Sequence, residues 1–282
     1  MPHCFFVSDL HGHPSRYNTL FQQIRAKKPD VVLIGGDLLS HGMGKNADFD
    51  DFFNDFLLAS FTNLKKEMKS QYPVVMLILG NDDARITEQD FIEAEKLGVW
   101  KYLHQRKFDH DGISFYGYSY IPPSPFRLKD WERYDVSRYA DPGCIHPTEG
   151  FFTVKPDVDI EYSTIKEDLE NLVRDDNLKN AVLLFHSPPY QTGLDRAALD
   201  GKYIDHVPLD VHVGSIAIKR FIEERKPLIS LHGHIHESSR LTGKWKEKIV
   251  DTISMNAAWD GPELSLISFH TEDPSKAVRK IL

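Results

Sequence analysis

The chain has 282 residues, of which 41% are hydrophobic and 27% are charged. These fractions are typical of a globular protein and exclude a chain that is mostly disordered or fibrous. Only two cysteines occur, Cys4 and Cys144, which excludes a disulfide framework and a four-thiolate zinc site. The formal net charge of −8 disfavours sequence-specific nucleic-acid binding, because phosphate contacts need lysine and arginine.

The N-terminal residues lack the basic region and the long apolar stretch of a signal peptide. No apolar run approaches the roughly 18 to 20 residues that a membrane-spanning helix needs. We therefore expect a cytoplasmic protein that does not bind membranes. Because fourteen histidines stand against two cysteines, we expect any metal to be held by imidazole and carboxylate groups.

Short apolar runs alternate with amphipathic segments in the first part of the chain. Residues 5–8, 31–35 and 74–79 are bounded by polar residues or glycine and predict buried strands. Residues 15–27 and 48–69 carry apolar side chains at helical spacing, and the phenylalanines of the second segment are expected in the core. The succession predicts a β-α-β-α-β unit with parallel strands and right-handed crossovers.

The pattern is less regular further along the chain. We predict helices over 88–97, 163–174 and 214–225, and strands over 113–120, 181–185, 228–231, 248–254 and 263–269. Residues 121–159 hold many prolines and predict an irregular excursion over the surface. We expect a single domain of residues 1–282, an α/β fold in which two sheets pack face to face with helices outside.

Metal-ligating side chains follow five of the predicted strands directly. They are Asp9, His11, Asp37, Asn81, His186, His234 and His236. The carboxyl ends of strands in open α/β sheets line the ligand crevice, so we expect these side chains to converge. Their number is too large for one tetrahedral zinc and suits two metals that share a bridging carboxylate.

In these positions the sequence resembles the calcineurin-like metallophosphoesterases. The resemblance rests on five blocks in the family's order, which are Asp9-x-His11, Gly36-Asp37, Gly80-Asn81-x-Asp83, His186 and Gly233-His234-x-His236. Residues 186–195 and 233–238 are similar to a prokaryotic branch of predicted phosphoesterases. The resemblance implies a four-layer α/β/β/α sandwich of two mixed sheets.

The resemblance also implies a role for each ligand. Asp9, His11 and His236 would hold one metal. Asn81, His186 and His234 would hold the other, and Asp37 would bridge both. The function implied is a dinuclear metal-dependent phosphohydrolase, in which a metal-bound hydroxide attacks a phosphoester in line. Imidazole, carboxylate and amide ligands suit two Mn, Fe or Zn ions, of which Mn is favoured. The partner expected is a phosphoester substrate, possibly one that resembles a nucleotide.

Asp82 departs from the family pattern. Many members carry histidine directly after the metal-binding asparagine, where it contacts the phosphate and assists the leaving group. A carboxylate beside an anionic phosphate is unfavourable unless it is protonated or turned away. Two hypotheses follow. Either the enzyme relies on its metals, with Asp37, Asn81 and Asp82 as the catalytic residues and phosphodiesters preferred over monoesters, or it is a non-catalytic scaffold that retains the fold.

Two further residues are predicted to bind substrate. His212 stands just before a predicted helix start, where backbone amides can bind phosphate, and Tyr190 follows two prolines beside His186. A plain loop role is the alternative for both. Asp83 is expected to orient a neighbouring ligand or to cap the helix near Glu88. His232 is expected to be a core histidine or to support a neighbouring ligand, rather than to bind metal itself.

Overall fold

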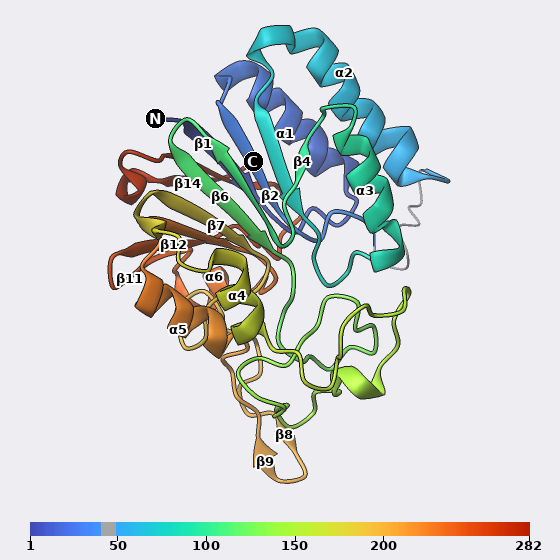
Figure 1. The fold of residues 1–282 in the computed structure, drawn as a ribbon, viewed down its shortest axis with the longest axis vertical. Helices are drawn as coiled ribbons and strands as arrows, with labels where there is room; N and C mark the ends of the chain where they lie inside the picture. The colour runs from blue at the N-terminus through green and yellow to red at the C-terminus, as the bar shows by residue number, and fades with distance from the viewer. Residues whose placement is uncertain (41–48) are drawn as a thin grey trace.

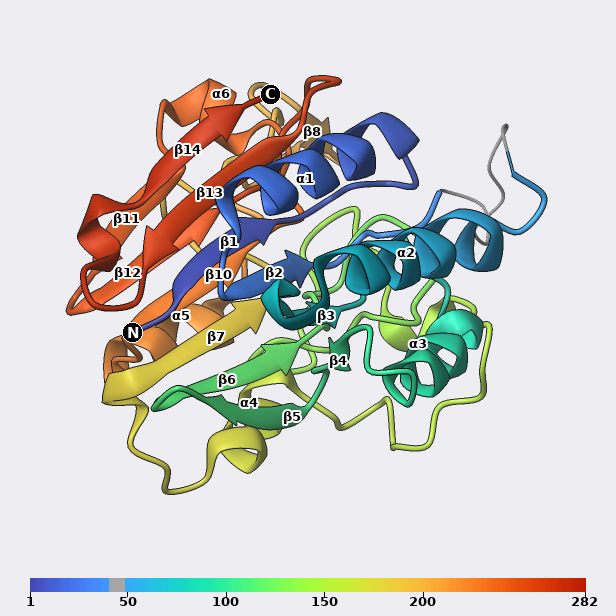
Figure 2. The same cartoon turned by 90° about the horizontal axis from the view of Figure 1, so that it is seen from above.

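A computed structural model of the chain describes residues 1–40 and 49–282. Within these residues the strands form two six-stranded sheets and a small hairpin. The first sheet has the order β14-β13-β1-β2-β3-β4, which Figure 2 shows from above. Its strands are β1 (His3–Val7), β2 (Val31–Gly35), β3 (Val74–Ile78), β4 (Lys101–Tyr102), β13 (Ser265–His270) and β14 (Val278–Ile281).

The second sheet has the order β11-β12-β10-β7-β6-β5. Its strands are β5 (Arg106–His110), β6 (Ile113–Tyr118), β7 (Ala181–Phe185), β10 (Ile229–His232), β11 (Lys246–Ile249) and β12 (Thr252–Asn256). The hairpin joins β8 (Tyr203–Ile204) to β9 (Val207–Pro208) and projects from the lower end of the molecule in Figure 1.

Helices cover the outer faces of both sheets (Figure 1). On the first sheet lie α1 (Pro14–Lys27), a π-helical segment (Phe52–Leu58) that continues into α2 (Ala59–Met68), and α3 (Glu88–Glu95). On the second lie α4 (Ile165–Val173) and α5 (Ile216–Arg225), and the short α6 (Ser238–Thr242) follows β10. None of the helices in the described ranges combines the length and the apolar character that crossing a bilayer requires.

The alternation of side chains along the strands produces this layering. In β1, Cys4 and Phe6 point into a core that residues of both sheets share, while Phe5 and Val7 join the core beneath the helices. Strands β2, β3, β6 and β7 alternate in the same way. Each strand therefore buries both of its faces, which is why these runs are almost continuously apolar. The predicted four-layer α/β/β/α sandwich is confirmed.

The predicted opening unit is present, because β1, β2 and β3 pair in parallel. Of the helix predicted over 48–69, residue 48 lies outside the described residues, and the helical structure begins at Phe52. The strand predicted over 248–254 is wrong. This stretch spans the antiparallel hairpin of β11 and β12, and the chain turns at Val250, whose φ is +54°.

The segment 121–159 carries little regular structure and is held by buried polar contacts. Its only helical turn is the 3-10 turn Pro147–Glu149. Lys129 and Glu132 form an ion pair whose side chains are both fully buried, and Glu132 also accepts a hydrogen bond from the amide of Ser124 at 2.8 Å. The Trp131 indole donates to the carbonyl of Asp83 at 2.6 Å. The segment is thereby attached to the loop that follows β3.

Candidate metal centre

The loops that leave β1 and β2 are bonded to each other through their backbones. The amide of Asp9 donates to the Gly36 carbonyl at 3.0 Å, and that of His11 donates to the Asp37 carbonyl at 2.8 Å. Asp9, His11 and Asp37 all have positive φ angles, between 47° and 57°. Non-glycine residues rarely adopt this conformation, and it concentrates at functional sites. These turns bring three candidate ligands from two strands together.

A first group of ligand atoms comprises Asp9, His11, Asp37 and His236, all within 4.8 Å of one another. His236 Nε2 lies 3.1 Å from Asp9 Oδ1 and 3.1 Å from His11 Nε2. Asp9 also accepts a hydrogen bond from the backbone amide of His234 at 3.0 Å, which ties the loop after β10 to the loop after β1.

A second group comprises Asp37, His186 and His234, again within 4.8 Å. His186 Nδ1 bonds to the Gly35 carbonyl at 2.8 Å, which leaves Nε2 facing Asn81 Oδ1 at 2.9 Å and Asp37 Oδ2 at 3.3 Å. All seven predicted ligands thus meet at the carboxyl ends of strands from both sheets. Asp37 is the member common to both groups.

The electrostatics of the cluster favour positive charge. Burial alone would raise the pKa of Asp9, but the hydrogen bond from His236 and the neighbouring imidazoles lower it to about 2. Burial would lower the pKa of His186, yet Asp37 raises it to about 10. Burial would also lower the pKa of His236, but the hydrogen bond and the charge of Asp9 raise it to about 9. His234, in contrast, has its pKa lowered to about 3 by burial and by His186.

The donor set fits divalent cations. His11 Nε2 and His236 Nε2 face each other at 3.1 Å, so either one nitrogen donates a hydrogen bond to the other, or a cation lies between two lone pairs. Nitrogen and oxygen donors without any thiolate are the ligands expected for Mn, Fe or Zn. Two groups that share one carboxylate can hold a pair of cations.

Asp83 organises the loop behind the bridging carboxylate. Its buried side chain accepts hydrogen bonds from the amides of Leu38, Leu39 and Gly80 at 2.7 to 3.0 Å. It therefore holds the backbone that follows Asp37, as expected for a residue that orients a neighbouring ligand. The expected helix cap is wrong, because Thr87 stands at the N-cap of α3 without a side-chain cap.

His212 and Tyr190 lie in the long loop between β7 and α5. His212 Nδ1 is 2.8 Å from the buried Asp195, and the Tyr190 hydroxyl donates to Asp210 at 2.6 Å. The two rings are in edge contact, with centroids 6.2 Å apart. Both rings thus contact residues of their own loop, and their binding of substrate stays a prediction.

His232 is a core residue, as expected. It is fully buried, stacks on Phe185 at a centroid distance of 5.6 Å, and bonds to Ser187 and Ser230 through its two ring nitrogens.

Two positioning residues escaped the sequence reasoning. The Arg16 guanidinium donates to the Asp9 carbonyl at 2.6 Å and to the Gly261 carbonyl at 2.6 Å. Asp195 accepts from the amides of Gln191 and Thr192 and shapes the loop that carries His212. An arginine on a helix and an aspartate in a turn give no distinctive sequence signal.

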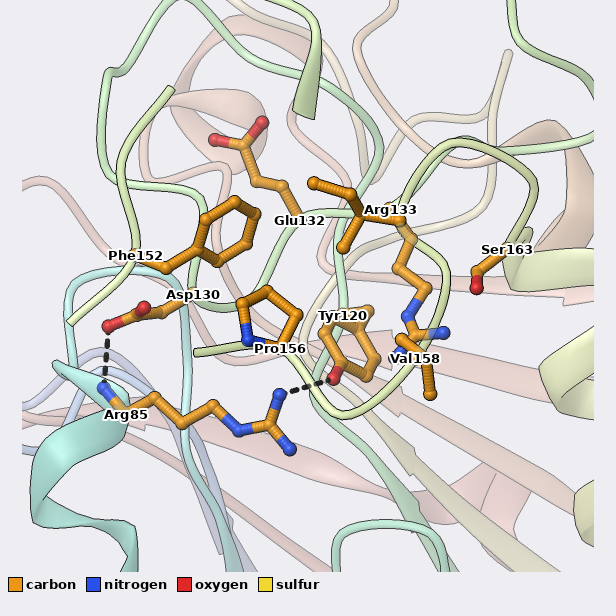
Figure 3. A pocket seen from close by; sticks show the side chains of 10 residues that line it. Arg85, Tyr120, Asp130, Glu132, Arg133, Phe152, Pro156, Val158 and Ser163 are labelled. Atoms are coloured by element: carbon orange, nitrogen blue, oxygen red, sulfur yellow. Dashed lines mark hydrogen bonds between the residues drawn. The ribbon is translucent and has the colours of Figure 1, made fainter. Parts of the chain in front are cut away.

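A separate shallow hollow, open to solvent, lies under the irregular segment (Figure 3). Arg85, Tyr120 and Arg133 line it, and none of the seven ligands does. Arg85 Nη1 donates to the Tyr120 hydroxyl, as Figure 3 shows. The guanidinium groups are already paired, Arg85 with Glu88 and Asp157, and Arg133 with Asp168.

Comparison with known proteins defines the class. The sequence model of the calcineurin-like phosphoesterase family matches residues 3–238. The chain belongs to this family, and the resemblance predicted from its motifs is confirmed.

Individual relatives are more distant. An uncharacterized protein of Methanocaldococcus jannaschii, MJ1162, is 40% identical over 90 residues, which cover 31% of this chain and 34% of that protein. The matched part thus spans about a third of the relative. The crystal structure of TT1561 of Thermus thermophilus has a TM-score of 0.58 and 13% identity over 99% of this chain and 98% of that one. A further crystal structure reaches a TM-score of 0.63 at 16% identity and covers 100% and 99%. Both structures support the fold.

Proposed function

We propose that this protein is a dinuclear metal-dependent phosphoesterase that prefers phosphodiesters to phosphomonoesters. The observation that carries the proposal is the position of Asp37, whose carboxylate belongs to both groups of ligand atoms. Asp9, His11 and His236 complete one metal site, and Asn81, His186 and His234 complete the other. Two divalent cations, when bound, would supply Lewis acidity to the phosphoryl oxygens and to a water molecule.

The protein's own groups fix where this chemistry takes place. Asp37 Oδ1 accepts a hydrogen bond from the Asp82 amide at 2.9 Å. This hydrogen bond orients the carboxylate so that Oδ2 faces His186 and His11. Asp9 and Asp37 are 1% exposed. Their charges are little screened by water and attract cations strongly.

Asp82 supports the preference for diesters. Its side chain is 23% exposed and lies beside the candidate metal centre, 3.5 Å from His11. It therefore adds negative charge where a substrate phosphate would approach. A phosphomonoester carries a charge of about −2 near neutral pH and a diester carries −1, so repulsion by Asp82 penalises the monoester more. No imidazole stands at this position to protonate a poor leaving group.

The experiment compares two aryl substrates on the purified protein. After chelation and dialysis we expect background turnover of bis-p-nitrophenyl phosphate and p-nitrophenyl phosphate. Addition of Mn²⁺ should restore turnover, with the diester hydrolysed faster. Asp37→Asn should abolish the restored activity, whereas Asp200→Asn at an exposed position should not. If the protein binds two Mn²⁺ ions but hydrolyses both substrates only at background rates, the proposed enzyme activity is refuted and the non-catalytic scaffold is favoured.

A further inference from the structure

Asp82 contacts the candidate metal ligands, not the bulk solvent alone. Its carboxylate Oδ1 accepts a hydrogen bond from Asn81 Nδ2 at 3.1 Å. Its Oδ2 lies 3.5 Å from His11 Nδ1. Its backbone amide donates to Asp37 Oδ1 at 2.9 Å. One residue therefore touches three ligands, one from each of the loops after β1, β2 and β3.

The contact with Asn81 selects the atom that the amide offers to the centre. An asparagine side chain carries a donor NH₂ and an acceptor oxygen on opposite sides. The Asp82 carboxylate accepts only from the NH₂ side, so the oxygen is turned to the other side, where it lies 2.9 Å from His186 Nε2. Without this carboxylate the amide would be free to present its NH₂ group, which is no metal ligand.

The Asp82 carboxylate acts on His11 through its charge at 3.5 Å and favours a hydrogen on Nδ1. A carboxylate near Nδ1 stabilises the Nδ1–H tautomer and leaves the lone pair on Nε2. That Nε2 atom faces His236 Nε2 at 3.1 Å and Asp37 Oδ2 at 3.9 Å. The side chain of Asp82 thus orients Asn81 and His11, one ligand of each metal site, and its backbone amide orients the bridging carboxylate of Asp37.

We propose that Asp82 is a positioning residue for metal binding, which sets the amide orientation of Asn81 and the tautomer of His11. This role rests on the proposed metal centre and explains a carboxylate where a phosphate-binding histidine is usual. Carboxylates that orient metal ligands typically contribute 10-fold to 100-fold to metal affinity.

The test measures Mn²⁺ affinity by calorimetry on the full chain after chelation. Asp82→Leu removes the acceptor and keeps the same branched arrangement of heavy atoms, and we expect Mn²⁺ to bind 10-fold to 100-fold more weakly. Asp82→Glu keeps a carboxylate and should recover part of the loss. Asp157→Asn removes one negative charge from an exposed side chain beside Arg85, and this matched control should bind Mn²⁺ as the wild type does.

Two further readouts separate positioning from a general loss of structure. With saturating Co²⁺, Asp82→Leu should shift the visible ligand-field bands, because the donor geometry changes, while far-ultraviolet circular dichroism stays unchanged. In a His11→Ala background the effect of Asp82→Leu should shrink, since part of it acts through the imidazole. An equal effect in both backgrounds would mean that Asp82 does not act through His11.

The outcomes distinguish this inference from the proposed function. A wild-type protein that binds no Mn²⁺ or Co²⁺ overturns both. A wild-type protein that binds metal, with Asp82→Leu within twofold of the Asp157→Asn control and with an unchanged Co²⁺ spectrum, overturns the positioning role and leaves the phosphoesterase in place.

Discussion

At the scale of the residue, the neighbours of a buried histidine decide whether it carries charge. His232 and His186 are both fully buried. His186 lies beside the Asp37 carboxylate, which raises its pKa to about 10, whereas His232 faces a carbonyl and a hydroxyl, and burial lowers its pKa to about 3. Asp37 therefore favours a positive charge at His186, from a proton or from a bound cation, whereas His232 is a neutral core residue.

The lowered pKa of His232 predicts that the free energy of unfolding falls at acid pH. An unfolded histidine has a pKa near 6.5, so between pH 6.5 and pH 3 the unfolded chain binds a proton at His232 that the folded chain does not. The contribution of this residue to the free energy of unfolding is present above pH 6.5 and falls with decreasing pH by at most about 1.4 kcal/mol per unit.

Urea unfolding of the wild type and His232→Gln in chelator at pH 7, 6 and 5 measures this contribution. The variant should be less stable at pH 7, because the stacking on Phe185 is lost, and the difference from the wild type should narrow as the pH falls. A constant difference across this range would show that His232 binds protons equally in the folded and the unfolded chain, and would contradict its lowered pKa.

The metal ligands could be predicted from the sequence more readily than the residues that support them. Asp9 and His236 stand directly after apolar runs, and their types alone suggest metal chemistry. Arg16 and Asp195 act through backbone groups that only the folded chain brings near. The side chain of Asp82 was expected to be either protonated or turned away, and its contacts with Asn81 and His11 depend on how three loops meet.

At the scale of the element, the aromatic stripe of the second helical segment anchors the outer layer. Phe61 in α2 is fully buried and makes edge contacts with Phe21 of α1 and with Trp100, at centroid distances of 5.0 and 5.5 Å. These rings fasten α2 to its neighbours through dispersion and through the favourable edge-to-face geometry.

Truncation of this ring should be costly. Phe61→Ala removes a buried aromatic side chain and leaves a cavity, so we expect the free energy of unfolding to fall by about 3 to 5 kcal/mol. Lys66→Ala on the exposed face of the same helix should change it by less than about 0.5 kcal/mol. Chemical denaturation of both variants provides the comparison, and similar values for the two would contradict the assigned core.

Edge strands account for most elements that the sequence did not predict. Strand β5 (Arg106–His110) has polar and largely exposed side chains, and β4 has only two residues. Strand β14 is exposed at three of its four positions. Edge strands often lack the apolar run that marks a buried strand, so the pattern carries little signal there. The interior strands β1, β2, β3 and β7 have that run and were predicted within one residue or two.

At the scale of the whole molecule, the centre lies where the two sheets meet. The first sheet contributes Asp9, His11, Asp37 and Asn81 from the loops after β1, β2 and β3, and the second contributes His186, His234 and His236 from the loops after β7 and β10. The order of the motifs predicted this meeting, because parallel strands end at one edge. The distances within the cluster depend on how the sheets pack through their shared core.

The loops that surround this edge differ from the sandwich in character. The segment 121–159 and the β8–β9 hairpin both lie toward the lower end of the molecule in Figure 1. They carry several exposed apolar side chains, including Phe126, Phe151, Tyr203 and Val207. Because the backbone here is irregular and the apolar residues show little periodicity, the sequence predicted no more than an irregular excursion over residues 121–159.

The most direct test of the central claim is the number of Mn²⁺ ions that one chain binds and whether they interact. Metal analysis after dialysis, combined with electron paramagnetic resonance, should give two ions per chain with the coupled signal of a pair that shares a ligand. Asp37→Asn should lose the coupled signal. A wild-type stoichiometry of zero or one under saturating Mn²⁺, or two ions without coupling, would contradict the account.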